Sequence, residues 1–282
     1  MTEGERISLK LDSTIPRPAS IRLMDFEVNP ISSADVVSLV AEAIRKRQKW
    51  IIGNHNLHSV YLWYHEPRMR LFYEAAEFIH IDGMPLILLA NLLGVSLRRE
   101  NRATSLDFFP ILASRAAKEN WRIFYLGSKP GVACRAAAKL SQSYPGLQML
   151  TRHGYFNTDK LNEENQRVVA EVNAYAPHVL MVGMGMPLQE KWILENRGDV
   201  CANVIFSAGA LMDYVAGEKP TPPRWLATLC LEWMYRLCSE PRRLWRRYLV
   251  EPWFVVVQVA KYLYSERLRQ TAENRRRTST GR

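Results

Sequence analysis

The sequence predicts an α/β fold: a mostly parallel, Rossmann-like sheet flanked by helices and followed by a basic, all-helical C-terminal appendage. Three observations support this prediction. Stretches with a helical hydrophobic period alternate along the chain with short apolar runs typical of buried strands. The 282 residues are 48% hydrophobic and 23% charged, as in an ordinary globular protein. Positive charge is concentrated near the C-terminus.

The order of elements follows from these patterns. Helices are expected where apolar residues recur every three or four positions, at 34–48, 58–76, 86–93, 106–120, 131–144, 161–176 and 187–196. Strands are expected at the short apolar runs between them, at 50–54, 78–81, 121–127, around 149, 178–185 and 203–209. Pro67 marks a break or a new first turn in the second helical stretch, and Gly94 closes the third. No internal repeat is visible.

Three segments are expected. Residues 1–20 are polar and form a flexible N-terminal segment without the apolar run of a signal peptide, so the protein is expected to stay in the cytosol. Residues 21–219 form the α/β core. Residues 220–282 form the appendage, because the three prolines of AGEKPTPPRW mark a boundary and every later segment is helix-like.

The cysteines and histidines do not suggest a disulfide or a metal site. The cysteines show no C-x-x-C spacing and occur in apolar contexts, which predicts reduced, buried thiols. They are Cys134, Cys201, Cys230 and Cys238. The histidines form no ligand pattern such as H-E-x-x-H. We therefore expect no metal and no cofactor.

The appendage carries most of the net charge. From Pro222 to the end there are thirteen basic residues against five acidic ones, a net charge of +8 out of +10 for the whole chain. Aromatic residues are interleaved with the arginines. Its longest uncharged apolar run, Pro252–Ala260, is far below the roughly 20 residues that span a bilayer. The pattern predicts helices that lie at an anionic lipid surface. The alternative is an appendage that packs on the body or on another subunit.

Asp82 stands in the stretch FIHIDGMPL, between two apolar runs, where a charge is costly. One interpretation is that Asp82 caps a helix beginning near Met84, since Asp is a favoured N-cap residue. The other is that its carboxylate follows a parallel strand, at the edge where clefts open in such sheets, and acts as a catalytic base. The residues themselves leave both interpretations open.

Two further strand ends carry polar groups. LGSKPG places Gly127 and Gly131 around a turn that opens a helix, which suits a phosphate but is also a common structural turn. This turn fits neither the Walker pattern nor the G-x-G-x-x-G fingerprint. GMGMPLQE places Gln189 and Glu190 in a first helical turn, either to complement the helix dipole or to hold hydroxyl groups of a ligand.

The stretch NHNLHS follows the strand expected at 50–54. Asn54 and Asn56 offer amide donors and acceptors at the end of that strand. His55 and His58 are interpreted as packing or capping residues rather than as ligands.

The order of these motifs resembles the WecG/TagA/CpsF glycosyltransferases, family 26 of the glycosyltransferases, over nearly the whole chain after about Ile21. The family's T-x-N-like segment corresponds to Asn54-His55-Asn56, and its D-G motif to Asp82-Gly83. The segments RATSLD, YLGSKPG, RHGYF, GMGMPLQE and DYVAG follow in the family's order. The closing LEWMYRLCSEPRRLWRRYL is similar to the family's C-terminal signature.

The resemblance implies an inverting, metal-independent sugar transferase. It would move a sugar from a UDP-sugar to a saccharide linked through diphosphate to a polyprenyl lipid. It would work as a peripheral protein at the cytoplasmic face of the bacterial inner membrane, in surface or exopolysaccharide biosynthesis. In the family the D-G aspartate is the proposed base, so Asp82 would accept the proton of the attacking hydroxyl.

The resemblance also implies the binding residues. The T-x-N and Q-E positions would hold the donor sugar. The leaving UDP develops negative charge, and without an Asp-x-Asp metal site the protein has to stabilise it with N–H groups and basic side chains, for which Lys129 and Arg102 are the candidates in the body. The expected substrate-binding set is Asn54, Asn56, Gly83, Arg102, Thr104, Asp107, Gly127, Lys129, Gly131, Gln189 and Glu190. The set expected at the acceptor diphosphate and the membrane is Arg224, Arg236, Arg242, Arg243, Arg246 and Arg247.

The chain departs from the family pattern at three positions. Asn54 replaces a threonine, Ser105 a glycine and Thr221 an arginine. The first change touches the donor pocket, so N-acetylmannosamine cannot be assumed. Glucose is the other option, as in members that build xanthan-type exopolysaccharides. The third change leaves Arg224 and Arg236 as substitutes at the diphosphate.

Two other classes of function are compatible with the residues. One is a non-catalytic nucleotide-binding module that its appendage tethers to a membrane. The other is a nucleic-acid binder, suggested by the arginines and aromatic residues of the appendage. No known DNA or RNA motif matches the basic segment, and the body is nearly neutral, so we expect no nucleic-acid partner. A homo-oligomer is compatible with the sequence.

Overall fold

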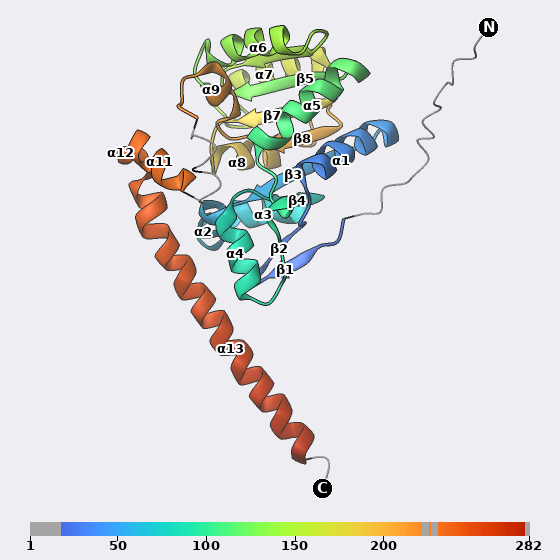
Figure 1. The fold of residues 1–282 in the computed structure, drawn as a ribbon. Helices are drawn as coiled ribbons and strands as arrows, with labels where there is room; N and C mark the ends of the chain where they lie inside the picture. Colours follow the sequence, from blue (N-terminus) through green and yellow to red (C-terminus); the bar gives the residue numbers. More distant parts are fainter. Residues whose placement is uncertain (1–17, 222–225, 227–230, 280–282) are drawn as a thin grey trace, which may run out of the picture.

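The computed structural model describes residues 18–221, 226 and 231–279, and it confirms the predicted α/β class (Figure 1). Its main sheet has six strands in the order β4-β3-β8-β7-β5-β6, and every neighbouring pair is parallel. The strands are β3 (Trp50–His55), β4 (Phe78–Ile81), β5 (Arg122–Gly127), β6 (Gln148–Arg152), β7 (Val179–Gly183) and β8 (Val204–Ser207). Because the sheet is parallel, all six strands end at one edge, where the polar motifs follow.

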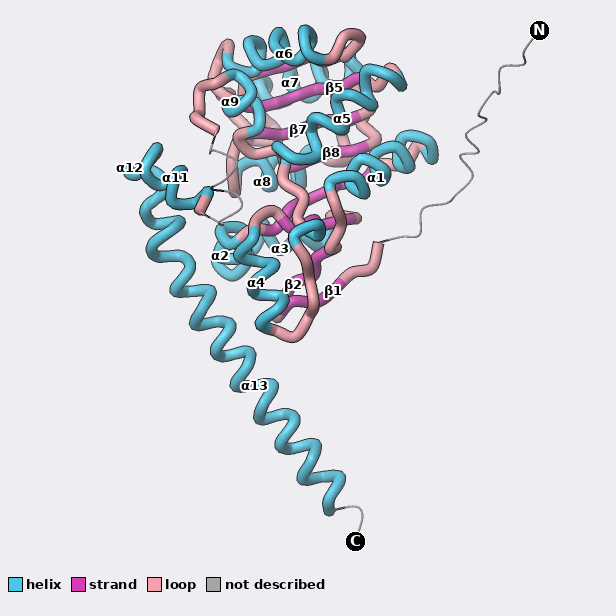
Figure 2. Tube along the Cα trace, in the orientation of Figure 1, coloured by secondary structure: helices cyan, strands magenta, loops and turns pink. Residues whose placement is uncertain are grey.

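Helices cover both faces of this sheet (Figure 2). One face packs against α1 (Ser33–Lys46), α5 (Ser105–Glu119), α6 (Val132–Ser143) and α9 (Leu211–Ala216). The other face packs against α2 (Leu57–His65), α3 (Pro67–Ala75), α7 (Glu163–Tyr175) and α8 (Leu188–Asn196). Helix α4 (Met84–Leu92) follows β4, and a 3-10 turn (Arg99–Asn101) leads to α5.

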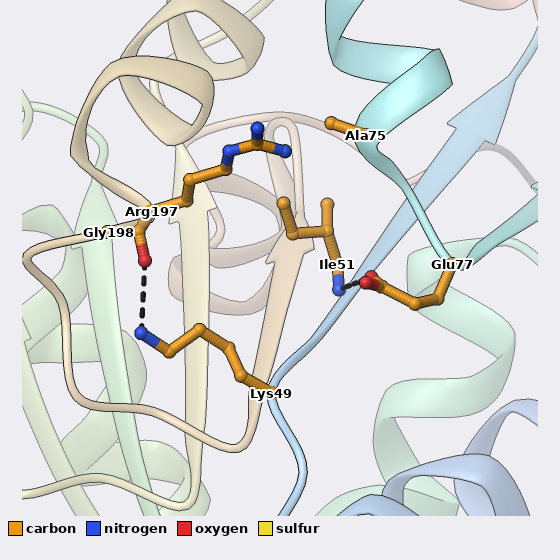
Figure 3. A pocket seen from close by; sticks show the side chains of 6 residues that line it. All are labelled: Lys49, Ile51, Ala75, Glu77, Arg197 and Gly198. Atoms are coloured by element: carbon orange, nitrogen blue, oxygen red, sulfur yellow. Dashed lines mark hydrogen bonds between the residues drawn. The ribbon is translucent and has the colours of Figure 1, made fainter.

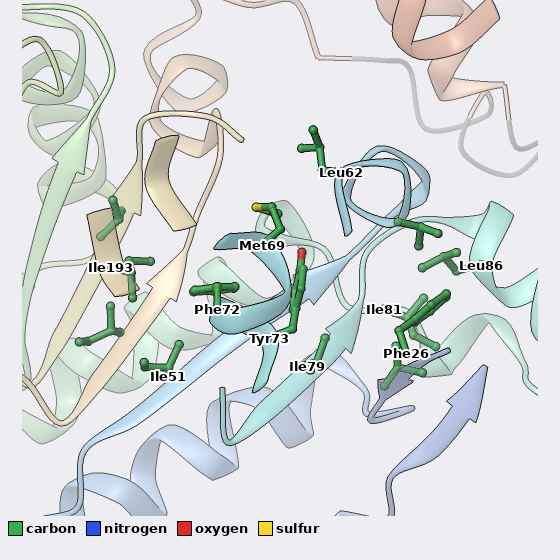
Figure 4. Packing of buried hydrophobic residues seen from close by; sticks show 14 of the residues in the cluster. Phe26, Ile51, Leu62, Met69, Phe72, Tyr73, Ile79, Ile81, Leu86 and Ile193 are labelled. Carbon is green, nitrogen blue, oxygen red and sulfur yellow. The ribbon is translucent and has the colours of Figure 1, made fainter. Parts of the chain in front are cut away.

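Two hydrophobic clusters lie on the two faces because successive side chains of a strand point in opposite directions. In β5, Ile123 and Tyr125 join one cluster, and Phe124 and Leu126 join the other. Figure 4 shows part of the second cluster, where Phe72 of α3 packs with its neighbours over the sheet. Burial on both faces explains why these strands read as continuous apolar runs in the sequence.

The structure refines several expected elements. The stretch 58–76 divides at Pro67, which occupies the first turn of α3, as the proline predicted. Helix α4 begins at Met84, two residues before the expected start. A two-stranded antiparallel hairpin, β1 (Ile21–Leu23) and β2 (Phe26–Val28), was not predicted. Strands of three residues are too short to show a hydrophobic period.

The prediction of buried thiols is wrong for Cys134, Cys201 and Cys238, which are exposed. The buried face of α6 runs through Ala133, Ala136 and Leu140, so Cys134 falls one position off that face. Apolar neighbours in the sequence therefore did not imply burial. Cys230 lies outside the described residues, as does nearly all of the segment 1–20.

Most of the described part of the appendage is helical. It contains α11 (Glu232–Ser239), α12 (Pro241–Trp245), a π-helical segment (Arg246–Val250) and α13 (Glu251–Ser279). Polar contacts join it to the body: Arg102 forms an ion pair with Glu232 at 3.5 Å and Lys219 one with Glu240 at 3.6 Å. His58 Nδ1 is hydrogen-bonded to Glu251 Oε2 at 2.6 Å. The first turns of α13 pack on α2, and the rest of the helix extends away from the body (Figure 1).

Among the described residues, no helix combines the length and the apolar composition that crossing a bilayer requires.

Candidate active site

A cleft of about 1390 Å³ opens at the carboxyl edge of the sheet. The segments that follow all six strands contribute lining residues, and α11, α12 and the π-helical segment form the opposite wall. This position follows from the topology. β5 and β7 are neighbours within the sheet, and the chain continues from β5 to β6 on one side and from β7 to β8 on the other, so the loops after these two strands diverge.

The cleft brings together part of the predicted binding set. Its lining includes Asn54, Asn56, Asp82, Thr104, Lys129, Gln189, Arg236, Arg243, Arg246 and Arg247. Other predicted residues are not in the lining: Gly83, Arg102, Asp107, Gly127, Gly131, Glu190 and Arg242. Arg224 lies outside the described residues.

Asp82 lines the cleft directly after β4. Its backbone N–H donates to the carbonyl of His55 at 2.7 Å, and its Oδ2 accepts from Asn56 Nδ2 at 3.3 Å. The capping alternative fails, because the N-cap of α4 is Gly83, at φ +119°, and no side chain caps that helix. A left-handed φ at this position favours glycine. The carboxylate is therefore held by Asn56, between β3 and α2, and Asp82 lines the cleft.

The two asparagines after β3 have different surroundings. Asn56 is the N-cap of α2: its Oδ1 accepts from Ser59 N at 3.0 Å. Asn54 is buried, and its Oδ1 has no hydrogen-bond partner among the described residues although Asn54 lines the cleft. A buried unpaired acceptor is costly unless a ligand satisfies it. Asn54 is thus the better placed of the two to accept a hydrogen bond from a ligand.

The two neighbouring histidines have different surroundings: His55 packs in the core, whereas His58 lines the cleft. His55 is fully buried and stacks on Tyr73 with ring centroids 3.8 Å apart. Burial lowers the pKa of His55 to about 3, with a further contribution from His80, so the ring is neutral. His58 joins the body to the appendage through Glu251.

The turn between β5 and α6 combines close packing with an open cation. A Cβ at Gly127 would clash with the backbone of Gly183, so the two strand ends can approach this closely because residue 127 is a glycine. Gly131, at φ +80°, starts α6. Lys129 lines the cleft, and its ammonium makes no ion pair with any described residue. The turn therefore offers a cation and helical N–H groups on one wall.

Arg102 and Asp107 serve the architecture. Thr104 caps α5 by accepting from Asp107 N at 3.2 Å. The Asp107 carboxylate accepts from Arg102 at 3.0 Å, and the other side of that guanidinium faces Glu232 of α11. Arg102 thus links the start of α5 to the appendage, while Thr104 alone of the three lines the cleft.

Gln189 and Glu190 lie at the floor of the cleft. Gln189 Oε1 accepts from the backbone N–H groups of Gly185 and Gly209, and its Nε2 donates to Glu190 at 2.7 Å. Gln189 is 1% exposed and lines the cleft, whereas Glu190 is 0% exposed and does not. Burial raises the pKa of Glu190 to about 7, opposed by the hydrogen bond from Gln189.

We expect Glu190 to make stability depend on pH. Because its pKa is raised above the unfolded value of 4.5, its contribution is complete below pH 4.5 and is lost as the pH rises through 7. The loss amounts to about 3 kcal/mol of unfolding free energy. The measurement is urea unfolding of the native protein and of Glu190→Gln at about pH 5 and about pH 8. Taking the difference removes the opposite trend from His55. Equal pH dependence in both proteins would contradict the expectation.

The appendage presents arginines to the cleft. Arg236 stacks over the ring of Tyr214 at 5.4 Å, and its Nε has no hydrogen-bond partner in the described part of the chain. Burial lowers the pKa of Arg247, while Tyr248 and Asp82 act in the opposite direction. Arg243 pairs with Glu240. Arg236 and Arg247 therefore face the same space as the Asp82 carboxylate without a described carboxylate bound to them.

A second, smaller pocket of about 280 Å³ lies at the other edge of the sheet (Figure 3). Lys49 donates to the carbonyl of Arg197 at 3.0 Å, and Glu77 accepts from Ile51 N at 2.5 Å. The charged groups of Lys49 and Glu77 are thus hydrogen-bonded to backbone groups of the protein itself.

A sequence model of the glycosyl transferase WecG/TagA/CpsF family matches residues 21–269. The chain belongs to this family. A curated relative from Bacillus spizizenii is 29% identical over 189 residues, which are 67% of this chain and 70% of the relative. Its name is N-acetylglucosaminyldiphosphoundecaprenol N-acetyl-beta-D-mannosaminyltransferase. The family match includes the described helices of the appendage through most of α13, and it makes the chain a glycosyltransferase.

In this WecG/TagA/CpsF glycosyltransferase, several cleft residues were not singled out from the sequence. Tyr155 and Phe156 project from the loop after β6, within the RHGYF motif. Asp213 lies 3.4 Å from Lys219 and belongs to the DYVAG motif. Both motifs were recognised as segments, but aromatic and acidic residues there gave no sign of which side chain would face the cleft.

Proposed function

We propose that this glycosyltransferase moves a sugar from a UDP-sugar to a polyprenyl-diphosphate-linked saccharide, with inversion and without a metal ion, in bacterial surface or exopolysaccharide biosynthesis. The observation that carries the proposal is a single cleft with a carboxylate, Asp82, on the sheet side and cationic Arg236 and Arg247 on the appendage side. The name of the Bacillus relative, which describes a diphosphate-linked undecaprenol acceptor, supports this class of substrate.

Asp82 is the general base of the proposed reaction. The acceptor hydroxyl attacks the anomeric carbon while its proton passes to the Asp82 carboxylate, and the bond to UDP breaks on the opposite side. Attack from the face opposite the leaving group inverts the configuration. Asn56 orients the carboxylate through its 3.3 Å hydrogen bond to Oδ2. Positioned general-base catalysis typically contributes about 10²- to 10⁴-fold to the rate.

The leaving UDP requires positive charge where its diphosphate lies. Lys129 and the N–H groups at the start of α6 form that wall of the cleft. Arg102 was the other candidate from the sequence, but its ion pairs with Asp107 and Glu232 engage it elsewhere. In this proposal Lys129 is therefore the body residue that stabilises the leaving group.

The acceptor diphosphate binds at the appendage wall. Arg236, Arg246 and Arg247 line the cleft, and none of them forms an ion pair with a described residue. Arginine can bind phosphate oxygens through two parallel hydrogen bonds. The acceptor sugar then extends from the arginines toward Asp82.

The outer face of α13 suits a lipid surface. Val255 and Val259 are buried toward the body. On the opposite face, Trp253, Val257, Tyr264 and Leu268 are exposed, with Trp253 at 71% and Tyr264 at 67%. Their spacing places them in one stripe of the helix. The appendage thus combines an apolar stripe with a high density of arginines, as in helices that bind membranes peripherally, here at the cytoplasmic face of the inner membrane.

Replacing Trp253, Val257, Tyr264 and Leu268 together by serine is expected to weaken binding to anionic vesicles at least about tenfold, because the stripe loses its apolar surface. Cosedimentation with phosphatidylglycerol vesicles measures the affinity. The control is Leu161→Ser, which alters a side chain that is 83% exposed in the loop before α7. Unchanged vesicle binding in the fourfold variant would contradict the membrane assignment.

The function is tested by incubating the purified protein with a panel of UDP-sugars and a short-chain, diphosphate-linked acceptor. We expect transfer from UDP-glucose or from UDP-N-acetylmannosamine. The panel identifies which of these two donors the pocket containing Asn54 binds. Product anomeric configuration reports inversion, and a reaction in excess chelator reports metal independence. Nucleotide binding without transfer of any sugar would favour the non-catalytic alternative.

A further inference from the structure

One side-chain oxygen joins the ends of two neighbouring strands at the floor of the cleft. Gln189 Oε1 accepts from Gly185 N, after β7, at 3.1 Å and from Gly209 N, after β8, at 3.2 Å. Both glycine loops line the cleft. The position of these loops therefore depends on how the amide of Gln189 is oriented.

Glu190 fixes that orientation. Gln189 Nε2 donates to Glu190 Oε1 at 2.7 Å. If the amide turned over, its NH₂ group would face the two N–H donors of the glycines, so both of those hydrogen bonds would be lost, and its oxygen could bond to Glu190 only when that carboxyl group is protonated and donates. Without Glu190 the oxygen end would still be attracted to the glycines, but the nitrogen end would have no buried acceptor.

Glu190 itself is not placed to touch a ligand. It is 0% exposed and is not among the cleft residues. Its Oε2 has no hydrogen-bond partner in the described part of the chain. A buried carboxyl group with one free oxygen costs stability unless it serves another group. Among the described residues, the side chain to which it is hydrogen-bonded is Gln189.

We propose that Glu190 is a positioning residue for the donor pocket: it locks the Gln189 amide so that Oε1 clamps the Gly185 and Gly209 loops and the second Nε2 hydrogen remains free for a sugar oxygen. The inference rests on the proposed function for the identity of the ligand. In this proposal Gln189 donates a hydrogen bond to a ligand oxygen, such as that of a sugar hydroxyl or an N-acetyl carbonyl. Glu190 orients the amide of Gln189.

The test compares Glu190→Leu with Glu190→Gln. Leucine removes the acceptor for Gln189, so we expect faster amide hydrogen exchange in the segments containing Gly185 and Gly209 and a donor KM raised about tenfold. Glutamine keeps an acceptor oxygen at the same place, so we expect both quantities to return toward the native values.

The reversed pair, Gln189→Glu with Glu190→Gln, separates the clamp from ligand binding. Glu at 189 can accept from both glycines and from Gln at 190, so exchange protection should be restored. The free amide hydrogen is lost, so the donor KM should stay high. Gln189→Glu alone places two carboxyl groups in contact, so we expect neither native exchange protection nor a native donor KM.

Two results would overturn the inference: unchanged exchange in Glu190→Leu, or a donor KM in Glu190→Gln as high as in Glu190→Leu, which would mean direct contact with the ligand. Exchange is measured without nucleotide. If the native protein transfers no sugar while hydrogen exchange follows the predicted pattern, the proposed function is wrong. The inference that Glu190 positions Gln189 and the two glycine loops is then still supported.

Discussion

Replacing Asp82 by asparagine is expected to lower kcat for sugar transfer by roughly 10²- to 10⁴-fold, since the acceptor hydroxyl loses its base. Asparagine can still accept the hydrogen bond from Asn56 and leaves the backbone contact with His55 intact. The fold and the affinity for UDP should therefore stay close to native. Initial rates at saturating donor and acceptor, with UDP affinity from calorimetry, measure the two effects separately.

Asp199→Asn is the matched control, because Asp199 forms an ion pair with Lys160 that is partly exposed and lies outside the cleft. That variant should retain native turnover. Turnover in the Asp82 variant equal to that of the control would remove Asp82 from the role of base. A large loss of UDP affinity instead of kcat would assign Asp82 to the donor.

Replacing Arg247 by methionine is expected to raise the acceptor KM by roughly ten- to a hundredfold, because the diphosphate loses one charged hydrogen bond, and such a loss typically has this magnitude. The same change at Arg236 should act similarly, because both guanidinium groups line the cleft and neither has a described carboxylate partner. Lysine at either position should recover only part of the loss, since it cannot bind a diphosphate through two parallel hydrogen bonds. The assay uses a short-chain acceptor in detergent, which removes the contribution of the membrane.

Arg242 provides the comparison, since it lies on α12 within the same basic run but is exposed and absent from the cleft lining. Arg242→Met should leave the acceptor KM near native. Equal losses from Arg242 and Arg247 would mean that the appendage acts through its total charge. A raised donor KM instead of a raised acceptor KM would mean that these arginines bind the UDP leaving group.

Much of the site could be predicted because each motif follows a strand of a parallel sheet. Asn54, Asp82, Lys129 and Gln189 come from four separate segments, and the sheet brings their ends to one edge. The same reasoning could not separate Gln189 from Glu190. Neighbours on a helix point about 100° apart, so only the packing of α8 decides which of the two reaches the cleft.

Arg102 shows a second limit of sequence reasoning. In the chain it is an arginine shortly before a helix, as a phosphate-binding residue can be. In the structure its guanidinium lies between Asp107 and Glu232, and Glu232 is 130 positions later in the sequence. A partner so distant in sequence cannot be inferred from local pattern.

The sequence by itself determined the α/β class, the order of the elements, the family and the division between a nearly neutral body and a basic appendage, because hydrophobic period, motif order and charge are local properties of the chain. The tertiary structure decided that the appendage lines the cleft on the side opposite Asp82, that Glu190 accepts a hydrogen bond from Gln189, and that Cys134, Cys201 and Cys238 are exposed. These depend on distances between segments far apart in the sequence, and long-range packing fixes such distances.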